Sequence, residues 1–199
     1  LGGFVEQNRK PDNLCFMLEA EAWRPIAPLP KACGAIACVE SNGFLHAVGG
    51  AGGDTFDTKR SVEWHLVYGP RIDQWATRAP LPTGRDHTGT LSIGGLIHVV
   101  GGRVDSFHTN SNLHHVYDPK DDKWRPRAPL PTARTGHGAV LHRGRIFVMG
   151  GEGTNRVFGQ NEAYDLAADK WESYAPMTTP RHGLGAVAIG DYIYVAGGG

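Results

Sequence analysis

Residues 133–151, ARTGHGAVLHRGRIFVMGG, carry the pattern that determines the fold. A short apolar run at 139–141 leads into a tight turn at Arg143-Gly144, and a second apolar run at 146–149 ends in a double glycine. Two short runs rich in β-branched and aromatic side chains, joined by a glycine turn, are typical of a β-hairpin. The stretch therefore predicts two antiparallel strands.

The hairpin pattern recurs along the whole chain. The double glycine stands at Gly49-Gly50, Gly101-Gly102, Gly150-Gly151 and Gly197-Gly198, with a further pair at Gly2-Gly3. A tryptophan follows in each unit, at Trp23, Trp75, Trp124 and Trp171, and both series are spaced by 52, 49 and 47 residues. Seven residues before each tryptophan stands an aromatic residue, Phe16, Tyr68, Tyr117 or Tyr164. The shared phase indicates four tandem units of one domain (1–199), which run over 2–48, 49–100, 101–149 and 150–196.

Each unit has the pattern of four short strands. In one copy the hairpin is followed by a polar stretch, then by a third strand that ends at 116–118 and a fourth that carries Trp124. Residues 96–100 are apolar almost throughout, which indicates that both faces of this strand are covered. No segment has helical periodicity. The prediction is an all-β chain whose small antiparallel sheets stack face to face around an axis.

This pattern resembles the Kelch-repeat family, and in style its bacterial members more than the animal adaptors. That family combines a double glycine, a spaced Tyr and Trp, and an Arg at the start of the next unit. The resemblance covers nearly the whole chain and implies a β-propeller, in which each four-stranded antiparallel blade has its first strand at the central channel and its Trp-bearing strand outermost. The first unit departs most, because Phe16 replaces the Tyr and Cys33 replaces the Arg.

The units are cut out of phase with the blades. Residues 1–30 should supply the outer half of one blade, and residues 178–199 the inner half of another. If these halves pair, a four-bladed ring closes. We favour an arc of a five- or six-bladed ring, because Gly2-Gly3 duplicates the role of Gly197-Gly198 and the sequence does not begin with Met. An arc with open edges would favour oligomerisation.

Composition argues against several classes of partner. Twenty basic and twenty acidic side chains leave no net charge, so no global field attracts nucleic acid or an anionic membrane. The apolar runs are far shorter than the roughly 20 residues of a membrane-spanning helix. Cys15, Cys33 and Cys38 form no CxxC pair, which indicates neither a disulfide framework nor a zinc site. The cellular compartment is not encoded in these features.

The candidate ligand contacts follow the repeat. Because the strands alternate in direction, the loops from second to third strands and the loops between blades emerge on one face. The candidates at the channel mouth on this face are Arg85, Arg134 and Arg181 with His87, His137 and His182. The resemblance implies that such arginines contact acidic peptides, which a guanidinium can bind in bidentate fashion. The alternative is that they bond backbone carbonyls and hold the blades together.

Unit-specific loops are the other candidates for recognition. Residues 51–62, 103–112 and 152–161 differ in length and charge, and their apolar members are Phe56, Phe107 and Phe158. The ten histidines follow the repeat rather than an HxH or HExxH pattern, and we predict neither a metal nor a cofactor. A ring of histidines at the channel mouth is the alternative.

These features favour a non-catalytic binding scaffold that recognises a protein or another polar or acidic ligand through the loop face. The main alternative is a carbohydrate-active enzyme similar to the sialic acid mutarotases or, less favoured, to the galactose oxidases. The latter need tyrosines as copper ligands, whereas Tyr68, Tyr117 and Tyr164 recur with the repeat, which indicates that they belong to its core. A chiefly structural role within a larger chain is the third reading.

Overall fold

The computed structural model describes residues 1–5, 10–55, 57–106 and 108–199, and these contain strands and no helix. Three complete blades are antiparallel sheets. Blade A comprises β6 (Ala37–Ser41), β7 (Phe44–Val48), β10 (His65–Gly69) and β11 (Gln74–Thr77). Blade B comprises β12 (Gly89–Ile93), β13 (Leu96–Val100), β14 (His114–Asp118) and β15 (Lys123–Arg127). Blade C comprises β16 (Gly138–His142), β17 (Arg145–Met149), β20 (Asn161–Asp165) and β21 (Lys170–Tyr174).

The blades stack around a common axis, as the repeat predicts. The first strands β6, β12 and β16 contact one another in order, and the Trp-bearing strands β11, β15 and β21 lie at the opposite edges of their sheets. The chain is therefore a β-propeller of four-stranded antiparallel blades. The predicted strands at 96–100, 139–141 and 146–149 and the predicted third strand that ends at 116–118 are all confirmed.

The two ends of the chain form half-blades. The first half-blade is β3 (Cys15–Glu19) with β4 (Ala22–Ile26), and the last is β22 (Gly185–Ile189) with β23 (Tyr192–Ala196). They are separate sheets, so the four-bladed closure does not form in this structure. The backbone explains this, because Gly2 N donates to Leu14 O at 2.9 Å and holds the place beside β3 that a closing β23 would need.

An interlocked aromatic wedge joins successive blades. Tyr117 of blade B is buried edge-on against His65 of blade A, with ring centroids 4.4 Å apart. Trp124 packs on the same histidine and donates Nε1–H to Ala79 O at 2.8 Å. Trp75 and Trp171 make the equivalent bond to the preceding blade. The repeated Tyr and Trp residues therefore hold adjacent blades together.

An aspartate completes each wedge. Asp122 Oδ1 accepts hydrogen bonds from Tyr117 Oη at 2.7 Å and from Ala79 N of the preceding blade at 2.9 Å. Asp73 and Asp169 repeat both contacts. The first half-blade has Phe16 and Glu21 at the two positions, so it loses the tyrosine and the aspartate together.

The double glycines allow adjacent blades to approach closely. Gly49 and Gly50 have φ values of +65° and +99°, which glycine adopts at little cost. A Cβ atom on Gly49 would lie 2.3 Å from Arg85 O, and Gly50 N donates to that same oxygen at 2.9 Å. Any side chain at Gly49 would therefore push apart the blade and the segment that enters the next one.

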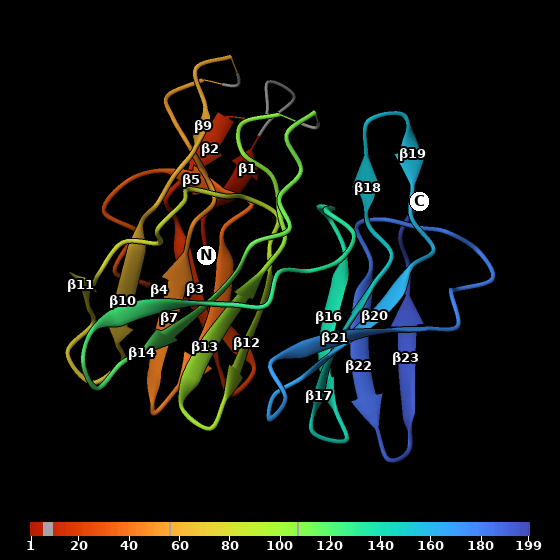
Figure 1. Cartoon of the computed structure of the whole chain (residues 1–199). Helices are drawn as coiled ribbons and strands as arrows, with labels where there is room; N and C mark the ends of the chain where they lie inside the picture. Colours follow the sequence, from red (N-terminus) through yellow and green to blue (C-terminus); the bar gives the residue numbers. More distant parts are fainter. Residues whose placement is uncertain (6–9, 56, 107) are drawn as a thin grey trace.

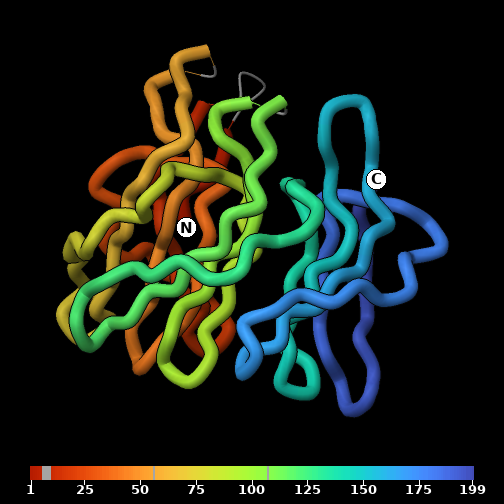
Figure 2. Tube along the Cα trace, viewed as in Figure 1, coloured from red at the N-terminus to blue at the C-terminus, as the bar shows by residue number. Residues whose placement is uncertain are grey.

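Short strands extend the blades on the predicted loop face. These are β1 (Gly3–Val5), β2 (Lys10–Asp12), β5 (Cys33–Gly34), β8 (Ala51–Gly52), β9 (Arg60–Ser61), β18 (Glu152–Gly153) and β19 (Arg156–Val157). In Figure 1 those that carry labels lie at one end of the long strands. Figure 2 shows the loops of three successive units rising at the same end. This face holds the candidate site.

Candidate binding site at the channel mouth

A belt of backbone hydrogen bonds surrounds the inner end of the loop face. The second residue after the Arg position is left-handed in every unit, with φ of 48° at Ala35, 52° at His87, 61° at Gly136 and 62° at Gly183. His87 N donates to Ala35 O, Gly136 N to His87 O, and Gly183 N to Gly136 O, at 3.3, 3.3 and 2.8 Å. Of these four residues, His87 alone has a side chain larger than a methyl group. His87 is therefore the one residue of these four whose side chain is large enough to contact a ligand at this belt of hydrogen bonds.

A buried ionic cluster holds His87 in place. Asp86 is buried, and its Oδ1 lies 2.5 Å from His87 Nδ1 and 2.7 Å from Arg103 Nε. Its Oδ2 accepts a hydrogen bond from Ser61 Oγ of blade A at 2.5 Å. Burial opposes ionisation of Asp86, but the bonds from His87 and Ser61 and the charge of Arg103 outweigh it and lower the pKa of the carboxyl. A carboxylate thus fixes a histidine whose side chain is 33% exposed.

A second polar pair lies at the next blade junction. Glu152 follows the double glycine of its unit, as Arg103 does in the preceding unit. Glu152 Oε2 lies 3.5 Å from His182 Nε2, and His182 Nδ1 lies 2.7 Å from Gly199 O. Both side chains are partly exposed. The mouth therefore presents charges of both signs.

The recognition loops are tied to one another across the blades. Ser61 N donates to Asp105 Oδ1 at 2.7 Å, and Asp105 N donates to Ser61 Oγ at 2.8 Å. Asn110 Nδ2 donates to Glu152 O at 2.7 Å. These bonds connect the described parts of the three loops to one another across the blades. Phe158 is buried as an anchor of the last loop, and the predictions for Phe56 and Phe107 fall outside the described residues.

Arg85 and Arg134 are fully buried, with 0% exposure, and they bond to the protein itself. Arg85 Nη1 donates to Gly101 O at 2.7 Å and to Leu113 O at 2.8 Å. Arg134 donates to Thr132 O and Val148 O, both at 2.9 Å, and pairs with Glu162. Both guanidinium groups are thereby withdrawn from the ligand surface, because they satisfy backbone carbonyls. Arg85 and Arg134 therefore have the alternative role, in which the repeated arginines bond backbone carbonyls and hold the blades together.

Arg181 differs from the other two arginines. It is partly exposed and donates once to Gly197 O, at 2.9 Å. In the first unit Cys33 Sγ makes the corresponding contact with Gly49 O at 3.6 Å. Arg181 is thus less enclosed than Arg85 and Arg134, and its ligand role stays a prediction.

The three candidate histidines lie in different environments. His87 and His182 are at the mouth, whereas His137 is buried between blades B and C. A Cβ atom on Gly89 would lie 2.8 Å from His137 Nε2, and burial lowers the pKa of His137 to about 3. The three rings therefore do not form a histidine ring. Among the described residues, no three His, Cys, Asp or Glu side chains group as metal ligands.

Two buried histidine pairs were not anticipated from the sequence. His46 Nδ1 lies 2.9 Å from His65 Nε2 in blade A, and His98 Nδ1 lies 3.0 Å from His114 Nε2 in blade B. Burial lowers the pKa of His65 and His98 to about 4 and that of His114 to about 3. These rings are neutral parts of the wedge.

The pairs predict acid sensitivity between pH 7 and 5. An unfolded histidine titrates near pH 6.5, so below that pH the unfolded chain binds more protons than the folded chain. Stability should be full above about pH 6.5 and fall progressively as the pH drops toward 4. Urea denaturation at pH 7 and pH 5 measures this difference.

Blade C provides the control, because Phe147 and Asn161 stand at the positions of His98 and His114. The double variant His98→Phe/His114→Asn should lose less stability from pH 7 to pH 5 than the unmodified chain. Parallel losses in the two proteins would show that the pair does not titrate as stated.

Comparisons with known proteins agree with the fold. The family model for the KLHDC2/KLHL20/DRC7 Kelch-repeats domain matches residues 1–198. Kelch-like protein 35 of Mus musculus is 33% identical over 90 residues, which are 45% of this chain and 15% of the relative. The solved structure of YjhT superposes with a TM-score of 0.83 at 16% identity, covering 99% of this chain and 71% of that chain.

The matched stretch is thus a small part of the mouse relative, and the structural likeness shows a shared fold. Among the described residues there is no helix that could cross a membrane. The match of the family model over almost the whole sequence, together with the blades described above, shows that this chain belongs to the Kelch-repeat family.

Proposed function

We propose that the chain is a non-catalytic binding module that recognises a protein or another polar ligand at the channel mouth. The observation that carries the proposal is the cross-blade bonding of the loops, which holds Ser61, Asp86 and Arg103 in one cluster beside His87. Such preorganisation lowers the entropy cost of binding. Kelch-repeat domains typically serve as protein-binding scaffolds, which supports this reading.

The partly exposed groups of the mouth favour an acidic ligand. Arg181 is a partly exposed cation, and the rings of His87 and His182 are partly exposed hydrogen-bonding groups. Glu152 lies among them, so a ligand that carries amides beside its carboxylates fits better than a simple anion. This surface is a proposed site for a peptide segment, with neither nucleic acid nor membrane as its partner.

A titration with acetylated hexaglutamate tests this site. The variants Arg181→Gln and His87→Gln should each weaken its binding by about tenfold, since a hydrogen bond to an ionised carboxylate contributes about 1.5–3 kcal/mol. Isothermal titration calorimetry measures the affinities.

Arg143→Gln is the matched control, because Arg143 lies in the turn at the opposite end of blade C and is paired with Asp191. Binding that is lost equally in this control, or retained in both mouth variants, would refute the proposed site.

The Asp86–His87 pair also supports the enzyme alternative. A buried carboxylate holds one ring nitrogen of a partly exposed histidine, which is the arrangement of a general acid–base catalyst. A sugar mutarotase acting here would lose most of its rate in His87→Gln while its fold persisted. Proton NMR of sialic acid anomer exchange, with and without the protein, separates this function from binding alone.

A further inference from the structure

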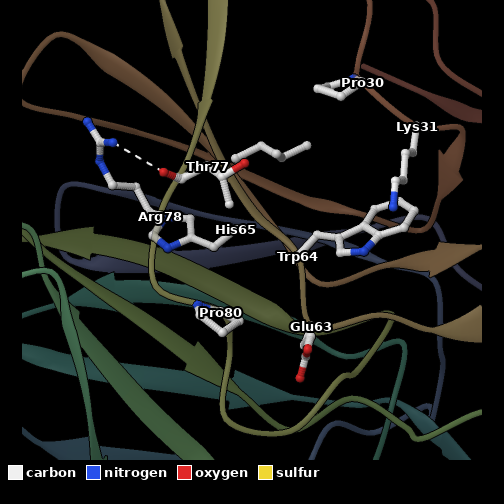
Figure 3. A pocket seen from close by; sticks show the side chains of 9 residues that line it. Pro30, Lys31, Glu63, Trp64, His65, Thr77, Arg78 and Pro80 are labelled. Carbon is white, nitrogen blue, oxygen red and sulfur yellow. Dashed lines mark hydrogen bonds between the residues drawn. The ribbon is translucent and has the colours of Figure 1, made fainter.

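A cleft outside the channel mouth lies between the segment that follows β4 and the outer part of blade A. Its volume is about 320 Å³, and its lining includes Pro30, Lys31, Glu63, Trp64, Arg78 and Pro80. Figure 3 shows Trp64 and Lys31 on one side of the cleft and Arg78 on the other. The cleft therefore has one aromatic wall and a cation at each side.

The aromatic wall is built by Trp64. Lys31 Nζ lies 5.3 Å from the indole centroid, a cation–π distance. Gly52 makes room for the ring, since a Cβ atom there would lie 2.7 Å from it. The indole thus stands as a supported, partly exposed apolar surface beside an ammonium group.

The repeat does not require these residues. The other units have Thr83, Thr132 and Thr179 at the position of Lys31, and Leu113 and Gln160 at that of Trp64. The wedge contacts that hold the blades are made by Tyr and Trp residues that recur, with His65, which also lines the cleft, as one of their partners. The combination of Lys31 and Trp64 is thus specific to this blade junction.

The charges of the cleft favour an anion. Arg78 Nη1 donates to Thr77 O at 3.2 Å, and neither Arg78 nor Lys31 forms an ion pair among the described residues. Glu63 is exposed, and its carboxylate points away from Lys31 in Figure 3. Two available cations against one carboxylate give the cleft a net positive charge.

We propose that this cleft binds an acidic, apolar peptide segment, in which one carboxylate pairs with Lys31, a second pairs with Arg78, and an aliphatic side chain packs on Trp64. The prolines at the rim add rigid apolar surface. The cleft is separate from the channel mouth, because none of Ser61, Asp86, His87 and Arg103 lines it.

The test is a ¹⁵N NMR titration that follows the indole N–H of Trp64, identified by its loss in Trp64→Phe. The probes are acetyl-Leu-Asp-Leu-Asp-amide and its neutral analogue acetyl-Leu-Asn-Leu-Asn-amide. The acidic peptide should give a saturable shift of this signal that the neutral peptide does not give. An equal response to both peptides, or to neither, would refute the proposal.

Charge variants sharpen the test. Lys31→Gln and Arg78→Gln should each weaken binding by about tenfold, as expected for loss of one charge-assisted contact. Glu63→Gln should strengthen it, and Lys170→Gln on blade C should leave it unchanged. Loss of the Trp64 response in His87→Gln would place the peptide at the channel mouth and overturn this inference, whereas an unchanged response keeps the two sites distinct.

Discussion

Replacing Trp124 with alanine is expected to lower the free energy of unfolding by about 3–5 kcal/mol, the usual cost of deleting a large aromatic side chain from a packed site. The ring fills the wedge between blades A and B, where it packs on His65 and Tyr117. The substitution also leaves Ala79 O without the hydrogen bond from Nε1. Urea denaturation followed by circular dichroism measures the loss.

Trp23 is the matched control, because it occupies the same repeat position but is 67% exposed in the first half-blade. Trp23→Ala should change the stability by less than about 1 kcal/mol, as surface substitutions usually do. Similar losses in the two variants would contradict the assignment of Trp124 to an inter-blade wedge.

The repeat made most of the fold predictable. The tryptophans and the double glycines recur with the same spacings. These spacings predict where the strands lie and that the sheets stack face to face. The aspartate of the wedge was missed although its signal is present, since Asp73, Asp122 and Asp169 each stand five residues after the repeated tyrosine. The spacing does not show that each aspartate accepts a hydrogen bond from an alanine N–H of the preceding blade, because that contact exists only in the folded chain.

The candidate site was less predictable, because it depends on what is not repeated. The ion pair joins Asp86 of one unit to Arg103 of the next and is not repeated among the described residues, so the spacing of the repeat does not predict it. The repeat predicted the arginines at the channel mouth, but the burial of Arg85 depends on the carbonyls Gly101 O and Leu113 O, which the path of the chain brings beside it. The presence of an arginine in the sequence does not tell whether its guanidinium is buried against backbone carbonyls or exposed to a ligand.

Arg134→Ala is expected to be the other strongly destabilising change, with a loss of about 3–5 kcal/mol. Arg134 and Glu162 form a buried ion pair, and both side chains are almost fully enclosed. Removal of the guanidinium leaves the carboxylate of Glu162 buried without its counter-charge and Val148 O without a donor. Chemical denaturation at pH 7 measures this loss.

Two further variants separate charge from volume. Arg181→Ala removes the repeat-equivalent arginine, which is partly exposed and makes one backbone bond, and should cost about 1 kcal/mol. The double variant Arg134→Met/Glu162→Leu removes both buried charges and fills the space, so it should be more stable than Arg134→Ala. If Arg134→Ala instead retained the stability of the unmodified chain, the buried pair would not hold blade C together. Ligand contact would then again be the better explanation of the repeated arginine.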